Sequence, residues 1–358
     1  MCGILGVCLD NSRERTEDDL MNIRSAFTDI LEESERRGRD ASGMYIVNPD
    51  GVVFFKAPER ASEMILTNEY WEFLDKHLTA DTIALIGHTR AATTGSPSCN
   101  DNNHPIVDTP IIGVHNGVIR NHEELGKSYK KCAEVDSAAI MSLLRVKSKK
   151  SPLKLTTLTK NLHELSGPFA IAVADVRKPD AIYMARNSNP VTFCRTGDGL
   201  LYFASTEEIL KDGLECTYTI NQLPFGSMPA NSACRIDPAG VRGEIKFSRL
   251  DPPKTTFSAR SSGPPVYSVP RVRHMLPTVT KADICPNCKQ VYTIAYMGEQ
   301  EIRCCGCLTV KSLFDDPIKK AGETARKKSS ENRMAIQDMQ EAPHPNLGKK
   351  KAGKKKAK

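Results

Sequence analysis

MCGILGV, residues 1–7, is the most informative part of the sequence, because removal of Met1 leaves a cysteine as the first residue of the chain. The side chain of Cys2 is small enough to permit that removal. The mature chain then carries a thiol and a free α-amine on one residue. An amine with an unperturbed pKa of about 7.7–8.0 can serve as the base for its own nucleophile. The alternative is that Cys2 is only a small residue at the start of a buried strand.

Further motifs follow Cys2 and favour the catalytic interpretation. They are RGRDASG (37–43), GHTRAATTG (87–95), HNGVIRNHE (115–123), Asp136-Ser137 at the start of an expected helix, LSGPFA (165–170), ARNSNP (185–190) and FASTE (203–207). In this order the series resembles the class II glutamine amidotransferases, the N-terminal-cysteine branch of the Ntn hydrolases. That family includes the glutaminase domains of glucosamine-6-phosphate synthase and amidophosphoribosyltransferase. The resemblance covers about residues 2–245.

The resemblance implies a catalytic set for the hydrolysis of a side-chain amide. Such a reaction needs a nucleophile, a proton shuttle and donors for the oxyanion of the tetrahedral intermediate. Cys2 supplies the first two and is expected to form a thioester. The side-chain amide of Asn116 and the backbone N–H of Gly117 are the expected oxyanion donors, since glycine lets the backbone approach a ligand closely. The alternative for these two residues is a plain Asn-Gly hairpin turn.

Three further residues are expected to bind the amino-acid end of glutamine. A guanidinium binds a carboxylate through two hydrogen bonds, so Arg90 fits the α-carboxylate, and the carboxylate of Asp136 fits the α-ammonium. Thr93 can add a hydroxyl contact. The alternatives are that Arg90 is a surface ion-pair partner and that Asp136 is the N-cap of a helix over residues 137–145.

Some residues near these positions depart from the family or are expected to have no catalytic role. Ala91 and Thr94 stand where family members often carry an aromatic residue and a bulkier or imidazole side chain. These departures put the affinity for the substrate, and the motion of the loop over the glutamine, in more doubt than the hydrolysis itself. The side chains of His88, His104 and His115 are expected to be structural.

The hydrophobic pattern predicts an α+β fold. Leu20, Ile23 and Phe27 recur at helical spacing behind Thr16-x-x-Asp19, which predicts an amphipathic helix. The resemblance implies a four-layer αββα Ntn-hydrolase sandwich. No apolar run is long enough for a signal peptide or a membrane span, so a cytoplasmic enzyme is expected. The expected strands cover residues 3–9, 44–56, 82–90, 110–119, 169–175, 181–185, 191–195 and 200–204.

The composition changes after the expected amidotransferase domain. Residues 246–278 are rich in Pro and Ser and read as a linker. Two Cys-x-x-Cys pairs then stand fifteen residues apart, a spacing that predicts a zinc ribbon over residues 279–318. Four thiolates would close the shell of a structural Zn²⁺, whereas glutamine hydrolysis needs no cofactor. Cys305 is an alternative to Cys304 as a ligand, and a redox-active or incidental cluster is the alternative to zinc. The expected ligands are Cys285, Cys288, Cys304 and Cys307.

The last segment, residues 319–358, carries the basic charge of the chain. It has 13 Lys and Arg against 4 Asp and Glu, a net charge of +9, while the whole chain has +7. Without aromatic residues to stack on bases, such a tail is expected to be disordered and to contact nucleic acid without reading its sequence. The alternative is a tail that only improves solubility.

These features predict a glutaminase subunit that converts L-glutamine to glutamate and supplies ammonia to a partner enzyme. The sequence has neither a glycine-rich phosphate loop nor an ATP-binding motif, so the site that accepts the ammonia is expected on another polypeptide. That partner is expected to be an ammonia-accepting synthetase or transferase, one that modifies a nucleotide or a nucleic acid. Two alternatives stay open. One is an Ntn amidohydrolase that acts on another amide without a partner, and the other is a non-enzymatic nucleic-acid-binding protein with a vestigial glutaminase domain.

Overall fold

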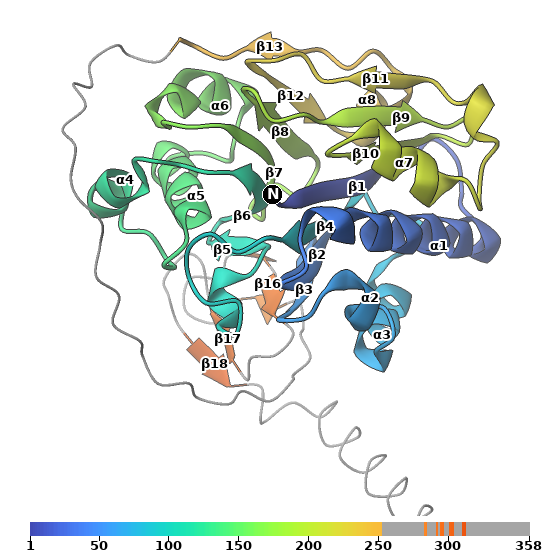
Figure 1. Cartoon of the computed structure of the whole chain (residues 1–358), viewed down its shortest axis with the longest axis horizontal. Helices are drawn as coiled ribbons and strands as arrows, with labels where there is room; N and C mark the ends of the chain where they lie inside the picture. The colour runs from blue at the N-terminus through green and yellow to red at the C-terminus, as the bar shows by residue number, and fades with distance from the viewer. Residues whose placement is uncertain (253–282, 285–290, 293, 297–300, 304–309, 313–358) are drawn as a thin grey trace, which may run out of the picture. The chain divides into compact units, whose positions relative to one another are not determined.

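The computed structural model describes residues 1–252, 283–284, 291–292, 294–296, 301–303 and 310–312 (Figure 1). The chain divides into two units, residues 1–311 and 312–358, and the description below concerns the first. The four expected zinc ligands and the basic tail lie outside the described residues, and so does most of the expected linker.

The first sheet has the N-terminal strand near its centre. Every residue of β1 is buried, because the strand has a partner on each side and both of its faces are covered. Its register places Gly3 opposite Thr89 and Leu5 opposite Ala204. The pairings are antiparallel except that of the last strand, which is parallel. The order is β11 (Phe225–Ser227), β9 (Thr192–Arg195), β10 (Leu200–Ala204), β1 (Gly3–Leu9), β4 (Ala84–Arg90), β2 (Ala41–Asn48), β3 (Gly51–Ala57) and β16 (Ile294–Tyr296).

All strand pairs of the second sheet are antiparallel. Its order is β13 (Ser248–Arg249), β12 (Ser232–Ile236), β8 (Ile182–Arg186), β7 (Phe169–Asp175), β6 (Ile111–Gly117) and β5 (Ile106–Asp108). Two further strand pairs lie in the region of the expected ribbon. They are β14 (Asp283–Ile284) with β15 (Val291–Tyr292), and β17 (Glu301–Arg303) with β18 (Val310–Ser312).

Three apolar cores define the layers of this part of the chain. The central core joins the two sheets, and it contains Ile4 and Phe203 of the first sheet and Val114 of the second. One outer core packs the first sheet against α1 (Glu17–Ser34), α2 (Ala61–Met64), α3 (Asn68–His77) and α7 (Glu207–Leu214). The other packs the second sheet against α4 (His122–Tyr129), α5 (Asp136–Lys147) and α6 (Leu155–Asn161). The order of helices, sheet, sheet and helices agrees with the layers that the resemblance implied.

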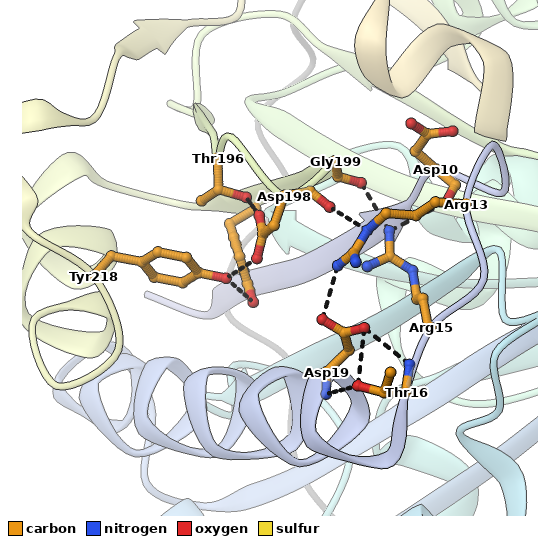
Figure 2. Close-up of polar contacts among 10 residues, drawn as sticks. Asp10, Arg13, Arg15, Thr16, Asp19, Thr196, Asp198, Gly199 and Tyr218 are labelled. Carbon is orange, nitrogen blue, oxygen red and sulfur yellow. Dashed lines mark hydrogen bonds and ion pairs between the residues drawn. The ribbon is translucent and has the colours of Figure 1, made fainter.

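Helix α1 begins where the sequence predicts. The hydroxyl of Thr16 accepts a hydrogen bond from the Asp19 N–H at 3.2 Å, and the Asp19 carboxylate accepts one from the Thr16 N–H at 2.9 Å (Figure 2). These two bonds satisfy backbone donors that have no partner inside the helix. Leu20, Ile23 and Phe27 are buried against the first sheet, as their spacing predicts.

A polar cluster holds the far end of β1, away from Cys2 (Figure 2). Arg15 is 7% exposed, and its Nη2 donates to the carbonyl oxygens of Asp10 at 3.1 Å and Gly199 at 3.0 Å. The Tyr218 hydroxyl donates to the Asp198 carboxylate at 2.9 Å. The cluster therefore joins the end of β1 to the turn before β10.

One expected strand proves to be two. The run at residues 44–56 contains a turn at Pro49 and Asp50, and β2 pairs with β3 on either side of it. Helix α8 (Pro238–Arg242), whose Val241 enters the central core, and the strands β5, β11, β12 and β13 were not expected from the sequence.

Candidate active site

Five of the six glutamine-site residues expected from the sequence line one pocket, and the sixth, Asn116, directly precedes the lining residue Gly117. Cys2, Arg90, Thr93, Gly117 and Asp136 all line it. They come from the start of β1, the end of β4 and the loop after it, the end of β6 and the start of α5. Because Gly3 pairs with Thr89, Cys2 lies beside Arg90, where β1 begins and β4 ends. The pocket thus lies where strands of both sheets end. Its other lining residues are Ala91, Thr94, His104, His115, Val135 and Ser137.

The Cys2 thiol is held at the pocket by the backbone of Ala91. The Ala91 N–H donates to Sγ at 3.4 Å, and Sγ donates to the Ala91 carbonyl at 3.6 Å. Burial raises the pKa of Cys2, while the Ala91 N–H, the N-terminal ammonium and Arg90 act in the opposite direction. The thiol is therefore protonated at neutral pH and needs a base. Met1 is 79% exposed and so is accessible for removal, which would place the α-amine on Cys2 itself.

Arg90 is 3% exposed, which contradicts the alternative of a surface ion pair. Its Nη1 donates to Oδ1 of Asn103 at 2.6 Å. Its Nη2 donates to the carbonyl oxygens of Thr94 at 2.6 Å and Gly95 at 2.9 Å. The guanidinium is thus fixed by the loop that follows β4.

Asp136 is the first residue of α5, and its N-cap is Val135, so the alternative that Asp136 is the N-cap is wrong. The side chain is 6% exposed. One carboxylate oxygen accepts a hydrogen bond from the Ile119 N–H at 2.7 Å, and the other accepts one from the Ser137 N–H at 2.9 Å. Each oxygen keeps a lone pair for another donor. A negative charge at the start of a helix is also favourable, because the helix dipole is positive there.

Asn116 and Gly117 are the last two residues of β6. They pair with Ala170 and Phe169, so they do not form the two-residue hairpin turn considered as an alternative. Asn116 is 1% exposed, and its Oδ1 and Nδ2 have no hydrogen-bond partner among the residues that the structure describes. A buried amide without a partner costs free energy, which a bound oxyanion would offset in part at Nδ2.

Gly117 has a φ of 150°, a conformation that favours glycine. A Cβ at this position would lie 2.0 Å from the carbonyl oxygen of Pro168. The end of β6 can therefore take this path past Pro168 only because residue 117 has no side chain.

Two residues that hold the site were not singled out from the sequence. Nε of Arg37 donates to the carbonyl oxygen of Cys2 at 2.9 Å, and Asn103 receives the bond from Arg90. Arg37 stands in the RGRDASG motif, which could have pointed to it. Asn103 has no such sequence pattern. Thr93 lies at the pocket in the loop after β4 and is exposed.

The comparisons with known proteins agree with this geometry. The chain is 32% identical over 229 residues to a glutamine–fructose-6-phosphate aminotransferase (isomerizing) of Staphylococcus epidermidis, a match that covers 62% of this chain and 34% of the relative. Residues 88–212 match the family model described as a glutamine amidotransferase domain. The chain carries a class II glutamine amidotransferase domain. Proteins with this domain are enzymes with an N-terminal cysteine.

A solved structure shares the fold of this domain, and a second one is also similar. One, described as the allosteric regulatory enzyme of purine biosynthesis, has a TM-score of 0.50 and 16% identity, and the match covers 70% of this chain and 49% of that chain. Another, the glutamine phosphoribosylpyrophosphate amidotransferase of B. subtilis, has a TM-score of 0.49 and 16% identity over the same shares. The chain spans about a third of the length of the curated relatives that it matches.

Membrane-spanning helices and clusters of metal-binding side chains are both absent from the described residues. Within this part of the chain no helix has both the length and the apolar character needed to cross a membrane. The same residues contain no group of three or more His, Cys, Asp or Glu side chains placed to hold a metal ion. The cysteines of the expected zinc ribbon lie outside them.

Proposed function

We propose that the protein hydrolyses L-glutamine to glutamate through a thioester on Cys2. The observation that carries this proposal is the convergence of unlike groups at one pocket. A thiol lies beside a buried guanidinium and a buried carboxylate, and the buried amide next to Gly117 has no partner. Arg90 and Asp136 suit the two charged groups of a free amino acid, which an amidohydrolase acting on another amide would not need.

The reaction follows from the roles of these groups. The α-amine of Cys2 takes the thiol proton, and the sulfur attacks the side-chain amide carbon of glutamine. The oxyanion that forms accepts hydrogen bonds from Nδ2 of Asn116 and the N–H of Gly117. The α-ammonium then gives its proton to the leaving nitrogen, so that the C–N bond breaks and ammonia departs. Water attacks the thioester with the amine as base, and glutamate and the free thiol result.

The test is turnover by protein whose N-terminus has been measured. Intact mass should show that active protein begins at Cys2, and a glutamine-analogue electrophile should label this residue alone. Cys2→Ser should abolish hydrolysis while the unfolding temperature changes little. Cys216→Ser, at an exposed cysteine, is the matched control and should keep full activity. Active protein that retains Met1, or faster hydrolysis of another amide than of glutamine, would contradict the proposal.

We further propose that the ammonia is used by a synthetase or transferase on another chain, in nucleotide or nucleic-acid modification. The support is that the matched relatives are about three times as long as the shared region. Affinity capture of the protein under native conditions should co-purify an enzyme whose glutamine-dependent product forms only with both chains. Product formation by this chain alone would oppose the idea. Twelve cysteines suit a reducing compartment, and we propose a cytoplasmic location on that ground.

We propose that a structural Zn²⁺ is held by four cysteines outside the described residues. Thiolates are soft ligands, and two Cys-x-x-Cys pairs bring four of them together without a large core. Metal analysis should give one zinc per chain, Cys305→Ser should keep it, and chelation should leave glutamine hydrolysis intact. Freshly purified protein without zinc would exclude the site. The proposed ligands are Cys285, Cys288, Cys304 and Cys307.

We propose that the basic tail contacts nucleic acid through its charge. The support is the net charge of +9 over residues 319–358. Truncation after residue 318 should remove an affinity for RNA or DNA that falls steeply with salt, while glutamine hydrolysis is unchanged. Equal binding by the full-length and the truncated protein would argue for a tail that only improves solubility.

A further inference from the structure

Three buried imidazoles and one hydroxyl form a connected group in the wall of the pocket and behind it. We call His88, His104, His115 and Ser137 the imidazole cluster. Nε2 of His104 and Nδ1 of His115 each lie 2.9 Å from the hydroxyl oxygen of Ser137. Nε2 of His88 lies 3.0 Å from the backbone carbonyl oxygen of His115. The rings of His88 and His104 stack with their centroids 3.9 Å apart. No side chain of the cluster is more than 4% exposed.

The cluster joins elements that belong to different layers. His88 lies in β4 of the first sheet, His115 in β6 of the second, and Ser137 in α5 of the outer helix layer. Each of these is one or two positions from a residue of the proposed site. The pairs are His88 with Arg90, His115 with Asn116, and Ser137 with Asp136. His104 directly follows Asn103, whose side chain accepts the hydrogen bond from Arg90.

The three imidazoles are neutral near neutral pH. Burial lowers the pKa of His88 to about 3 and lowers the pKa of His104 and His115 as well. Arg90 and Lys56 lower the pKa of His104 further, whereas Asp136 opposes the shift at His115. A neutral imidazole has one nitrogen that donates and one that accepts.

Neutral rings restrict the arrangement of protons in the cluster. Because the carbonyl of His115 can only accept, Nε2 of His88 must carry a proton. The hydroxyl of Ser137 has a single proton, so it can donate to one ring and must accept from the other. Ser137 therefore links the tautomers of His104 and His115, because either both rings carry their proton on Nε2 or both carry it on Nδ1.

We propose that Ser137, through the imidazole cluster, is a positioning residue that holds the oxyanion donors and the ammonium-binding carboxylate in register with each other. The proposal rests on the glutamine hydrolysis proposed above. One nitrogen of each imidazole, Nδ1 of His88, Nδ1 of His104 and Nε2 of His115, has no hydrogen-bond partner among the described residues. The bonds to Ser137 are therefore the side-chain hydrogen bonds that tie His104 and His115 together, and breaking them in a low-dielectric interior leaves further buried polar atoms without partners. Loss of the Ser137 hydroxyl deprives two rings of a partner at once. The strand end that carries Asn116 and Gly117 is then free to shift relative to Asp136.

The test compares two serines of the same helix. Ser137→Ala should lower kcat for glutamine by about tenfold or more and raise its KM, since a displacement of about 1 Å can cost ~100-fold in rate. Ser142→Ala is the matched control, because Ser142 is also buried in α5 but its hydroxyl donates to the carboxylate of Asp108, away from the pocket. The control should change kcat and KM by less than about twofold at a similar change of unfolding temperature. Ser137→Thr restores a hydroxyl and should recover most of the loss.

Substitutions at His104 and His115 extend the test. The amide nitrogen of asparagine takes the place of Nδ1, and that of glutamine takes the place of Nε2. His115→Asn and His104→Gln should therefore keep more activity than His115→Leu and His104→Leu.

The outcomes separate the inference from the function that it rests on. If the wild type hydrolyses glutamine and Ser137→Ala matches it, or if Ser142→Ala loses as much kcat as Ser137→Ala, the positioning role is overturned while the proposed function stands. If wild-type protein that begins at Cys2 does not hydrolyse glutamine, the proposed function fails and the positioning role fails with it.

Discussion

The side chain of Asn116 is only 1% exposed, yet neither its Oδ1 nor its Nδ2 has a hydrogen-bond partner among the described residues. Its backbone carbonyl is satisfied, because Nδ2 of Asn189 donates to it at 2.8 Å. The strand end is therefore anchored while the side-chain amide stays available. Buried polar groups of this kind are found where a ligand supplies the missing bond.

A substitution at Gly117 tests the effect of adding one carbon atom, Cβ, at the proposed oxyanion site. Gly117→Ala should lower kcat by about 100-fold, because the added Cβ meets the Pro168 carbonyl and displaces an oxyanion donor. It should also lower the free energy of unfolding by about 1–3 kcal/mol, since the backbone conformation is strained for alanine. Steady-state kinetics and urea unfolding measure the two effects. Wild-type kinetics in this variant would remove Gly117 from the proposed oxyanion site.

Arg90 and Asp136 can be tested by changes that preserve size. Arg90→Lys should raise the KM for glutamine by about tenfold or more, because a point charge cannot replace a planar fork that also binds the loop at Thr94 and Gly95. Asp136→Asn should act in the same direction by leaving the substrate ammonium unpaired. Isothermal titration of glutamine into these variants in the Cys2→Ala background separates binding from turnover. Unchanged affinity in both would mean that the amino-acid end binds elsewhere.

At the level of elements, α1 shows what a local pattern can establish. The capping box at Thr16 and Asp19 and the apolar spacing behind it both act within one turn or two of the chain, and the structure confirms them. Strands β1, β7 and β10 have the predicted bounds because they are continuous apolar runs. Patterns of this kind need no knowledge of the rest of the fold.

The cap of α1 predicts a change of stability without a change of activity. Thr16→Ala should lower the free energy of unfolding by about 1 kcal/mol, because the Asp19 N–H loses its acceptor. The KM for glutamine should stay within error, since the pocket lies at the other end of β1. Chemical denaturation followed by circular dichroism measures the first effect. A loss of activity at unchanged stability would mean that the two ends of β1 are coupled.

Other elements could not be predicted because long-range contacts define them. The turn within residues 44–56 is an exception, because Asn48-Pro49-Asp50-Gly51 is a local turn pattern that the prediction of one strand overlooked, and the pairing of β2 with β3 shows the turn at Pro49 and Asp50. The short strands β5 and β13 become strands by pairing with longer neighbours. The same holds at the candidate site. The sequence motifs predicted most residues that line the pocket. They did not predict the contacts of Asn103 and Ser137, because those contacts join residues from separate segments of the chain.

On the scale of the whole molecule, the three cores within residues 1–252 enclose titratable groups that respond to acid. An imidazole has a pKa of about 6.5 in an unfolded chain, and burial lowers the pKa of His88 to about 3. Between these values the unfolded chain binds a proton that the folded chain does not. Stability is therefore complete above pH 6.5 and is lost as the pH falls.

Acid unfolding therefore tests the imidazole cluster as a whole. The free energy of unfolding should fall below pH 6.5 by up to about 1.4 kcal/mol per pH unit for each buried imidazole. His104→Gln should remove from that slope the contribution of one imidazole, up to about 1.4 kcal/mol per pH unit, whatever effect the substitution has on the free energy of unfolding at pH 7. Urea unfolding at a series of pH values gives the slope. Identical slopes for the variant and the wild type would mean that His104 is protonated in the folded protein.

The pairing of β1 with β10 also sets an order of events during synthesis. Leu5 lies opposite Ala204, so the strand that carries the nucleophile cannot take its final place until about two hundred more residues have left the ribosome. At about 5–20 residues per second, this leaves roughly 10–40 s in which β1 lacks at least one of its two neighbouring strands, since β4 is made earlier than β10. Under the function proposed above, removal of Met1 in that interval exposes the amine of Cys2 before the first sheet is complete.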